Sequence, residues 1–493
     1  MKDKIKEKNI WINKVKLEYI IMFIAIMIAV SIFTFYVKIG VNDELWNFSN
    51  IYKMTNGEII YKDCNVIVTP LFFYLGQLLF TLLNPNYLTF RIYNLIIYTI
   101  LYFLEYIIFR KFKIPKEQSV LFLIISFGIT GTMILIGANY NVLAIVFILL
   151  GILSNLKKEK HKYNNIIQGI IIFLVFMTKQ TIGILYLIGV ITYNIITIDN
   201  IKEKIKVNLK QILVFFAFIG VYIIYLATNN NLYNFINYTI LGLFDFSRNT
   251  NFDNYIIIFA IEIIINIFVL LIALFKRNKA EKIIMNNVIL LSIFSIMLLI
   301  NAYPIFNKAH IILYSFIFII LIEYLIKIIF LDKFKNLKNI NIIINIINVI
   351  ALCIIIVFSI CMNYLYITNL NKKYEPYYGG IIENSEQIDS VVDYIVSEKE
   401  NGIDVKFISC DANLYNNILK INNGRIDLPF YGNLGENGIN SLIEEIRKME
   451  NTNILISKEG LKYQEVEEII EFVKNNYSII GEINNYYIYR IEN

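Results

Sequence analysis

The residues best suited to chemistry are two adjacent carboxylates, Asp43 and Glu44, which follow the first long apolar run of the chain. A carboxylate at a membrane surface can act as a general base, because partial desolvation makes it more basic. The same residues also suit the start of a helix, where Asn42 or Asp43 would cap the N-terminus and Glu44 would favour its positive end. The two interpretations are compatible, since a capping side chain can also be catalytic.

Cationic and amide side chains recur at two later places. Lys179 and Gln180 separate two short apolar runs, and Lys308 and His310 follow a turn at Pro304. All four are suited to binding an anionic phosphate. Each also has an ordinary explanation, because a lysine at a helix end often extends to reach water and a lone histidine there is commonly interfacial.

Arg248 is a further candidate for phosphate binding, since a guanidinium can hold a phosphate through two hydrogen bonds. It stands with Asp245 in the loop 229–253 and is the only arginine expected on the outer face before residue 364. The alternative is that it is simply solvated, as loop arginines commonly are.

The composition places these residues in a membrane protein. Of the 493 residues, 57% are hydrophobic and only 17% are charged, whereas soluble domains carry about 25% charged residues. Charged residues are scarce before residue 364, whereas beyond it the chain is as charged as an ordinary soluble domain. The net charge of +6 is therefore interpreted as loop lysines that set the topology, and a nucleic-acid-binding surface is excluded.

Roughly eleven apolar runs are long enough to be candidate membrane spans. They lie near residues 17–39, 88–109, 118–137, 141–156, 165–178, 181–198, 209–228, 254–275, 283–301, 309–330 and 340–363. The first run has no small-residue cleavage site after it, which predicts an uncleaved span. The run 70–84 is short and is predicted to lie along the membrane surface.

The basic residues orient the chain, because loops rich in lysine and arginine stay in the cytoplasm. If 70–84 does not span, the N-terminus and the basic segments 110–113, 157–160, 202–210, 276–282 and 333–338 are all cytoplasmic. The opposite face then receives the loop 40–87, Lys179, Arg248, Lys308, His310 and the C-terminal part. These candidates, far apart in sequence, are thus expected to share one face of a multi-pass cell-membrane protein.

The pattern changes after residue 363. Residues 405–409 and 453–457 read as short strands, 441–449 and 463–475 as amphipathic helices, and 478–491 as a hairpin. The predicted fold is therefore a mainly α polytopic membrane domain, residues 1–363, followed by a small extracytoplasmic α/β domain, residues 364–493.

Several kinds of site are excluded by the residues present. The four cysteines show no C-x-x-C spacing and no disulfide framework, and two histidines exclude a His-rich metal site. No G-x-G-x-x-G fingerprint or P-loop is present.

The stretch from Val41 to Tyr74 resembles the first outer loop of GT-C glycosyltransferases. The resemblance rests on Asp43-Glu44, Asn56-Gly57-Glu58, Tyr61-Lys62-Asp63 and Thr69-Pro70-Leu71-Phe72-Phe73-Tyr74. It is similar to the protein O-mannosyltransferase and lipid A aminoarabinose transferase type, glycosyltransferase family 39, over roughly residues 10–330. Two departures stand near His310: bacterial members often have an Arg and an Asp where this chain has Ile305 and Asn307.

The resemblance implies an enzyme of the cell envelope that uses a polyprenyl-phosphate-linked sugar and an acceptor hydroxyl on a glycan, lipid or protein. Asp43 would be the general base and Glu44 would orient it, with Tyr61, Lys62, Asp63 and Pro70 in the supporting loop. Lys179, Gln180, Arg248, Lys308 and His310 would bind the donor phosphate. The run 70–84 corresponds to the family's membrane-surface helix. Whether a divalent metal takes part is left open by the sequence.

Two other classes remain as alternatives. A transporter or flippase for lipid-linked oligosaccharides would place charges inside spans, where Glu105 and Glu262 stand. A non-catalytic envelope-assembly protein would use the external domain to bind a partner.

Overall fold

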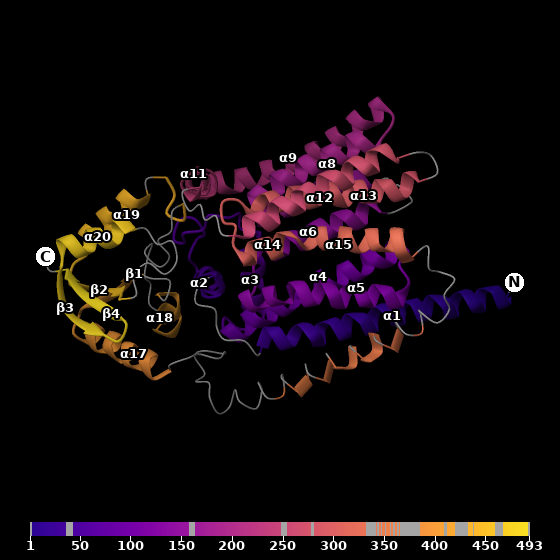
Figure 1. Ribbon diagram of the computed structural model, residues 1–493. Helices are drawn as coiled ribbons and strands as arrows, with labels where there is room; N and C mark the ends of the chain where they lie inside the picture. Colours follow the sequence, from indigo (N-terminus) through magenta and orange to yellow (C-terminus); the bar gives the residue numbers. More distant parts are fainter. Residues whose placement is uncertain are drawn as a thin grey trace.

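The computed structural model contains a helical bundle with a small α/β domain at one end, while the N-terminus lies at the other end (Figure 1). It describes residues 2–35, 43–156, 163–247, 254–277, 281–331, 385–408, 412–419, 432–436, 438–458 and 467–491, with scattered positions between 342 and 364. The predicted domain boundary at residues 363 and 364 lies in that scattered stretch and stays a prediction.

The bundle is built from apolar helices of different lengths. They are α1 (Lys2–Phe35), α4 (Tyr87–Lys111), α5 (Lys116–Thr130), α6 (Tyr140–Asn155), α7 (Asn164–Thr178), α8 (Gln180–Thr197), α9 (Ile201–Thr228), α12 (Tyr255–Phe275), α13 (Lys282–Leu299), α14 (Lys308–Tyr314) and α15 (Phe316–Ile326). Two short helices, α10 (Leu232–Ile236) and α11 (Gly242–Phe246), flank the π-helical turn η2 (Asn237–Leu241).

Among the described residues, seven helices are long and apolar enough to cross a membrane, and α14 with α15, bent by 50°, would make an eighth. The helices α6 and α7 are apolar but shorter. The expected span 118–137 is α-helical only to Thr130, after which Gly131–Ile136 form a 3-10 turn, η1. Of the predicted span 340–363, the structure describes only scattered positions between 342 and 361. The mainly α, polytopic class predicted from the sequence is confirmed.

The bundle has an apolar outside and a core in which several polar groups are paired with one another. Leu213, Ile264 and Phe268 are exposed on α9 and α12, as expected for helices that face lipid. Inside, Tyr98 donates a hydrogen bond to the carbonyl of Met133 (2.7 Å), and Tyr102 pairs with Thr130 (2.8 Å). A backbone or hydroxyl group in an apolar interior needs such a partner.

Two short helices, α2 (Asp43–Thr55) and α3 (Leu71–Leu82), form the loop between α1 and α4. They pack on each other, and Gln77 on α3 donates a hydrogen bond to the carbonyl of Met54 on α2 (2.8 Å). With 12 residues, α3 is too short to cross a bilayer, which fits its predicted place along the membrane surface.

The C-terminal domain has a four-stranded sheet in the order β1-β2-β4-β3. Its elements are α17 (Ser385–Glu400), β1 (Asp404–Ile408), α18 (Ala412–Leu419), α19 (Gly438–Arg447), β2 (Thr452–Ser457), α20 (Glu467–Asn476), β3 (Ser478–Ile483) and β4 (Tyr486–Ile491). β1 and β2 are parallel, whereas β4 is antiparallel to β2 and β3. The two strands and the hairpin predicted from the sequence are thus confirmed; residues 463–466 of the second predicted helix lie outside the described residues.

Side chains of β2 alternate between two cores, as the period of a strand requires. Ile454 and Ile456 pack with α19 and α20 on one face, and Leu455 packs with α17 and α18 on the other. The sheet is therefore covered on both faces, which explains the apolar run of β2.

Candidate active site

Asp43 and Glu44 open α2 and differ completely in exposure. Successive residues of a helix are turned by about 100° from each other. Asp43 is exposed, whereas Glu44 is 1% exposed. The pair is therefore divided into one accessible carboxylate and one buried carboxylate.

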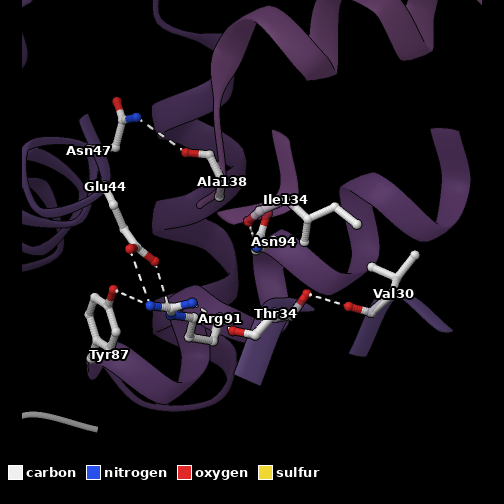
Figure 2. A network of polar contacts seen from close by, with 9 residues as sticks. All are labelled: Val30, Thr34, Glu44, Asn47, Tyr87, Arg91, Asn94, Ile134 and Ala138. Atoms are coloured by element: carbon white, nitrogen blue, oxygen red, sulfur yellow. Dashed lines mark hydrogen bonds and ion pairs between the residues drawn. The ribbon is translucent and has the colours of Figure 1, made fainter. Parts of the chain in front are cut away.

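The buried carboxylate of Glu44 is held by Arg91 of α4 (Figure 2). Arg91 Nε lies 2.9 Å from Glu44 Oε1, and Arg91 Nη2 donates to Oε2 at 3.2 Å. The guanidinium also donates to the carbonyl of Thr34 (2.6 Å) and the hydroxyl of Tyr87 (3.0 Å). This contact of two nitrogens with two oxygens fixes the orientation of α2 against α4.

The turn after η1 fits closely around Glu44. Gly137 has a φ of 83°, and a Cβ there would lie 2.7 Å from Glu44 Cγ. Next to it, the carbonyl of Ala138 accepts a hydrogen bond from Asn47 of α2 (3.2 Å) (Figure 2). Both the backbone conformation and the space at residue 137 therefore require glycine.

Asp43 and Lys179 interact electrostatically. Although Asp43 is accessible, the protein around it raises the pKa of its carboxyl through desolvation, and the charge of Lys179 opposes this rise. Burial lowers the pKa of Lys179 to about 8, and Asp43 acts in the opposite direction. Two of the residues predicted to share one face thus influence each other's protonation, and their place on the outer face stays a prediction.

Lys179 is held at the junction of α7 and α8 by residues of two other helices. Its Nζ donates to Asn141 Oδ1 and to the Tyr314 hydroxyl, each at 2.9 Å. The Tyr314 hydroxyl donates to the same Asn141 oxygen at 3.0 Å. The ammonium also lies 5.7 Å and 5.6 Å from the ring centres of Tyr140 and Tyr314, within range of cation–π attraction.

His310 lies beside this group, on α14. Asn307 caps that helix, because its Oδ1 accepts from the backbone N–H of His310 (2.9 Å) and lies 2.9 Å from His310 Nδ1. The ring centres of His310 and Tyr314 are 6.0 Å apart. The residue that departs from the family pattern, Asn307, thus serves as a helix cap that orients the imidazole.

The comparisons with known proteins give one structural match. No family model matches the chain, and no curated protein is significantly similar to it in sequence. Among solved structures, ArnT from Cupriavidus metallidurans in the apo state is similar, with a TM-score of 0.59 at 10% identity, over 96% of this chain and 98% of that chain. The chain has the GT-C fold.

The likeness to ArnT spans the bundle and the C-terminal domain together, since almost the whole of both chains is aligned. At 10% identity it shows the fold alone. Roles within this GT-C fold therefore depend on the contacts of the individual residues.

Gln180 follows Lys179 and binds backbone groups of two other segments. Its Nε2 donates to the carbonyls of Ile67 and Thr239, each at 2.8 Å, and its Oε1 accepts from the N–H of Thr69 at 3.3 Å. The amide therefore joins the outer loop and the turn η2 to the start of α8.

Lys308 begins α14, two residues before His310. It is exposed and lines an apolar cavity of about 510 Å³ between α5, α12, α14 and α15, which Glu262 and Glu323 also line. None of Asp43, Lys179 and His310 lines this cavity. The structure thus brings together Asp43, Lys179 and His310 but not Lys308, and Arg248 lies outside the described residues.

The supporting loop is folded around Tyr61. This residue has a φ of 69° and is buried, and its hydroxyl donates to the carbonyl of Val68 at 2.9 Å. Asp63 accepts from the N–H of Ile59 at 2.8 Å. Lys62 is exposed, and Pro70 is buried immediately before α3.

The part of the chain that the structure describes contains no group of three or more His, Cys, Asp or Glu side chains placed to hold a metal ion.

Arg91, Asn141 and Tyr314 contribute to the site but are not among the residues predicted from the sequence. Arg91 carried a usable signal, because a charged residue inside an apolar run needs a buried partner. Asn141 and Tyr314 carried none, since each is an ordinary residue of an apolar run until the fold brings it to Lys179.

Proposed function

We propose that the chain is a membrane glycosyltransferase of the GT-C type that transfers a sugar from a polyprenyl-phosphate donor to an acceptor hydroxyl on the outer face. The GT-C fold supports this class. The observation that carries the proposal is the electrostatic interaction between the accessible carboxylate of Asp43 and the partly buried ammonium of Lys179.

In the proposed reaction, Asp43 accepts the proton of the acceptor hydroxyl. The freed oxygen bonds to the anomeric carbon of the sugar while the bond from that carbon to the lipid phosphate oxygen breaks. A raised pKa makes the Asp43 carboxylate a stronger base than an ordinary aspartate. Lys179 stabilises the negative charge on the departing phosphate, and its low exposure strengthens that interaction.

Glu44 has a positioning role in this proposal. Both of its oxygens lie within 3.2 Å of Arg91 nitrogens, so it orients α2 and with it Asp43. Gln180 has a similar role, because its amide joins the start of α8, next to Lys179, to the backbone carbonyls of Ile67 and Thr239.

The central experiment is sugar transfer by the purified full-length chain, with radiolabelled polyprenyl-phosphate sugars as donors and envelope extracts as acceptors. Asp43→Asn is expected to lower kcat by about 10²–10⁴-fold, the usual contribution of a general base, with unchanged folding. Glu203→Gln, an exposed first-turn carboxylate on α9, is the matched control and should retain full activity. Unchanged transfer by Asp43→Asn would refute the assignment.

A transporter of lipid-linked oligosaccharides is the second candidate, favoured by carboxyls inside the bundle. Glu105 on α4 and Glu323 on α15 are 0% and 3% exposed, and buried acids at membrane depth often serve transport. This alternative predicts that Glu105→Gln and Glu323→Gln abolish movement of a fluorescent lipid-linked sugar across proteoliposomes while Asp43→Asn does not. The enzyme proposal predicts the reverse pattern for sugar transfer.

A further inference from the structure

The C-terminal domain contacts the bundle at the helix that carries Asp43. α18 packs against α2, and the two helices lie side by side in Figure 1. Leu414 of α18 packs against the core of the bundle and also against the core of its own domain. The domain is thus joined to the membrane part by shared apolar packing rather than by a linker alone.

A second contact joins the segment Gly432–Glu436 of that domain to the turn η2 and α11. The backbone N–H of Glu436 donates to Asn237 Oδ1 at 2.8 Å. A Cβ on Gly432 would lie 2.5 Å from the carbonyl oxygen of Gly242, and a Cβ on Gly435 would lie 2.5 Å from Asn237 Nδ2. Both Gly432 and Gly435 also have φ values in the left-handed region, 85° and 76°. The contact is between backbones at Gly432 and with the Asn237 side chain at Gly435, and the left-handed φ at both positions favours glycine.

The turn η2 at this contact is connected to Lys179 through Gln180. Asn237 is the first residue of the π-helical turn η2, and π-helical turns occur frequently at functional sites. Two residues later, the carbonyl of Thr239 accepts the hydrogen bond from Gln180 Nε2 at 2.8 Å. Gln180 is the neighbour of Lys179, so a short chain of hydrogen bonds and backbone connects Glu436 to the cation of the candidate site.

We propose that Asn237 is a positioning residue through which docking of the C-terminal domain sets the place of Lys179 opposite Asp43. The docked segment holds η2, η2 holds Gln180, and Gln180 holds the start of α8. In this proposal, the C-terminal domain contributes to the geometry of the site. The inference rests on the proposed glycosyltransferase function, because it assigns the contact a role in that reaction.

The test compares three full-length variants by hydrogen–deuterium exchange and by sugar-transfer kinetics. Asn237→Ala removes the acceptor of the Glu436 N–H, whereas Asn237→Asp keeps an oxygen at the same place. Asn234→Ala is the matched control: Asn234 is half-buried one turn earlier, and the hydrogen bond that it donates among the described residues is local, to Asn231 Oδ1 at 3.2 Å.

Asn237→Ala is expected to speed exchange in peptides covering residues 432–438 and to lower kcat by about 10–100-fold, with the acceptor KM unchanged. Asn237→Asp should restore slow exchange and most of the rate, and Asn234→Ala should behave like the native chain. Normal exchange at 432–438 in Asn237→Ala, or equal losses in the Ala and Asp variants, would overturn the inference. Either result leaves the assignment of Asp43 standing, because Asp43→Asn tests that separately.

Discussion

Arg91 on α4 holds both carboxylate oxygens of Glu44, the residue that directly follows Asp43 on α2. One acid of the adjacent pair is therefore used to lock the helix, and the other is left accessible at its start. The ion pair is fully buried, with Glu44 and Arg91 each 1% exposed. The orientation of Asp43 thus depends on a contact made by its neighbour.

Removing one partner of this ion pair should destabilise the chain strongly. Arg91→Met leaves the Glu44 carboxylate buried without its cation, which typically costs about 3–5 kcal/mol. The double variant Arg91→Met with Glu44→Gln should lose less than the sum of the single variants, because the uncompensated charge is gone. Thermal unfolding in detergent measures both, and strict additivity would contradict the coupling.

Substitutions at three glycines should distinguish the cost of backbone strain from the cost of steric overlap. Gly137→Ala combines a left-handed φ with a Cβ 2.7 Å from Glu44, whereas Gly57→Ala has a φ of 100° but nothing within 4 Å. We expect Gly57→Ala to cost about 1–2 kcal/mol from φ alone and Gly137→Ala to cost clearly more. Gly128→Ala, in helix α5 and open space, should be neutral or slightly stabilising. Unfolding midpoints of the three variants give the comparison, and equal losses at residues 57 and 137 would exclude the overlap with Glu44.

The transfer rate should depend on pH through Asp43 and Lys179. As the pH falls through the raised pKa of Asp43, the base becomes protonated and the rate drops. As the pH rises through about 8, the pKa of Lys179, the cation is lost and the rate drops again. A bell-shaped profile of kcat against pH is the expected result.

Lys179→Arg provides the control for the alkaline side of that profile. A guanidinium stays charged far above pH 8, so this variant should keep its rate where the native chain declines, even if its maximum is lower. An alkaline decline that is identical in both chains would assign that limb to another group.

Labelling of introduced cysteines tests the predicted orientation. Lys62 is exposed in the outer loop, so Lys62→Cys in a cysteine-free chain should react with an impermeant maleimide added to intact cells. Lys202→Cys, exposed at the start of α9, should react only after permeabilisation. The natural Cys64 is 2% exposed, which makes it a poor probe of topology. Labelling of Lys202→Cys but not Lys62→Cys in intact cells would invert the predicted topology.

Much of the fold follows from local patterns in the sequence. Apolar runs predict the helices, and the short apolar run 453–457 predicts the strand β2, whose Ile454, Leu455 and Ile456 pack on both faces of the sheet. The approach of Lys179 to Asp43 also followed, because the charge distribution of the loops places both on one side.

The contacts that build the site could not be predicted from the sequence, because they join residues that lie far apart in it. Glu44 meets Arg91, and Lys179 meets Tyr314, only through the packing of α2, α4, α7 and α14. The contacts of Gln180 could not be predicted either. An amide next to a lysine suggests contact with a ligand, yet the hydrogen bonds of Gln180 go to three backbone groups.

The hydrogen-bond partners of Lys179 among the described residues have a chemical consequence of their own. Both Asn141 and Tyr314 are neutral, so they fix the direction of the ammonium without cancelling its charge. A salt bridge in the same place would have satisfied the cation internally. The fold instead keeps a positive charge of fixed direction near Asp43, and that charge would attract an anion arriving beside the carboxylate.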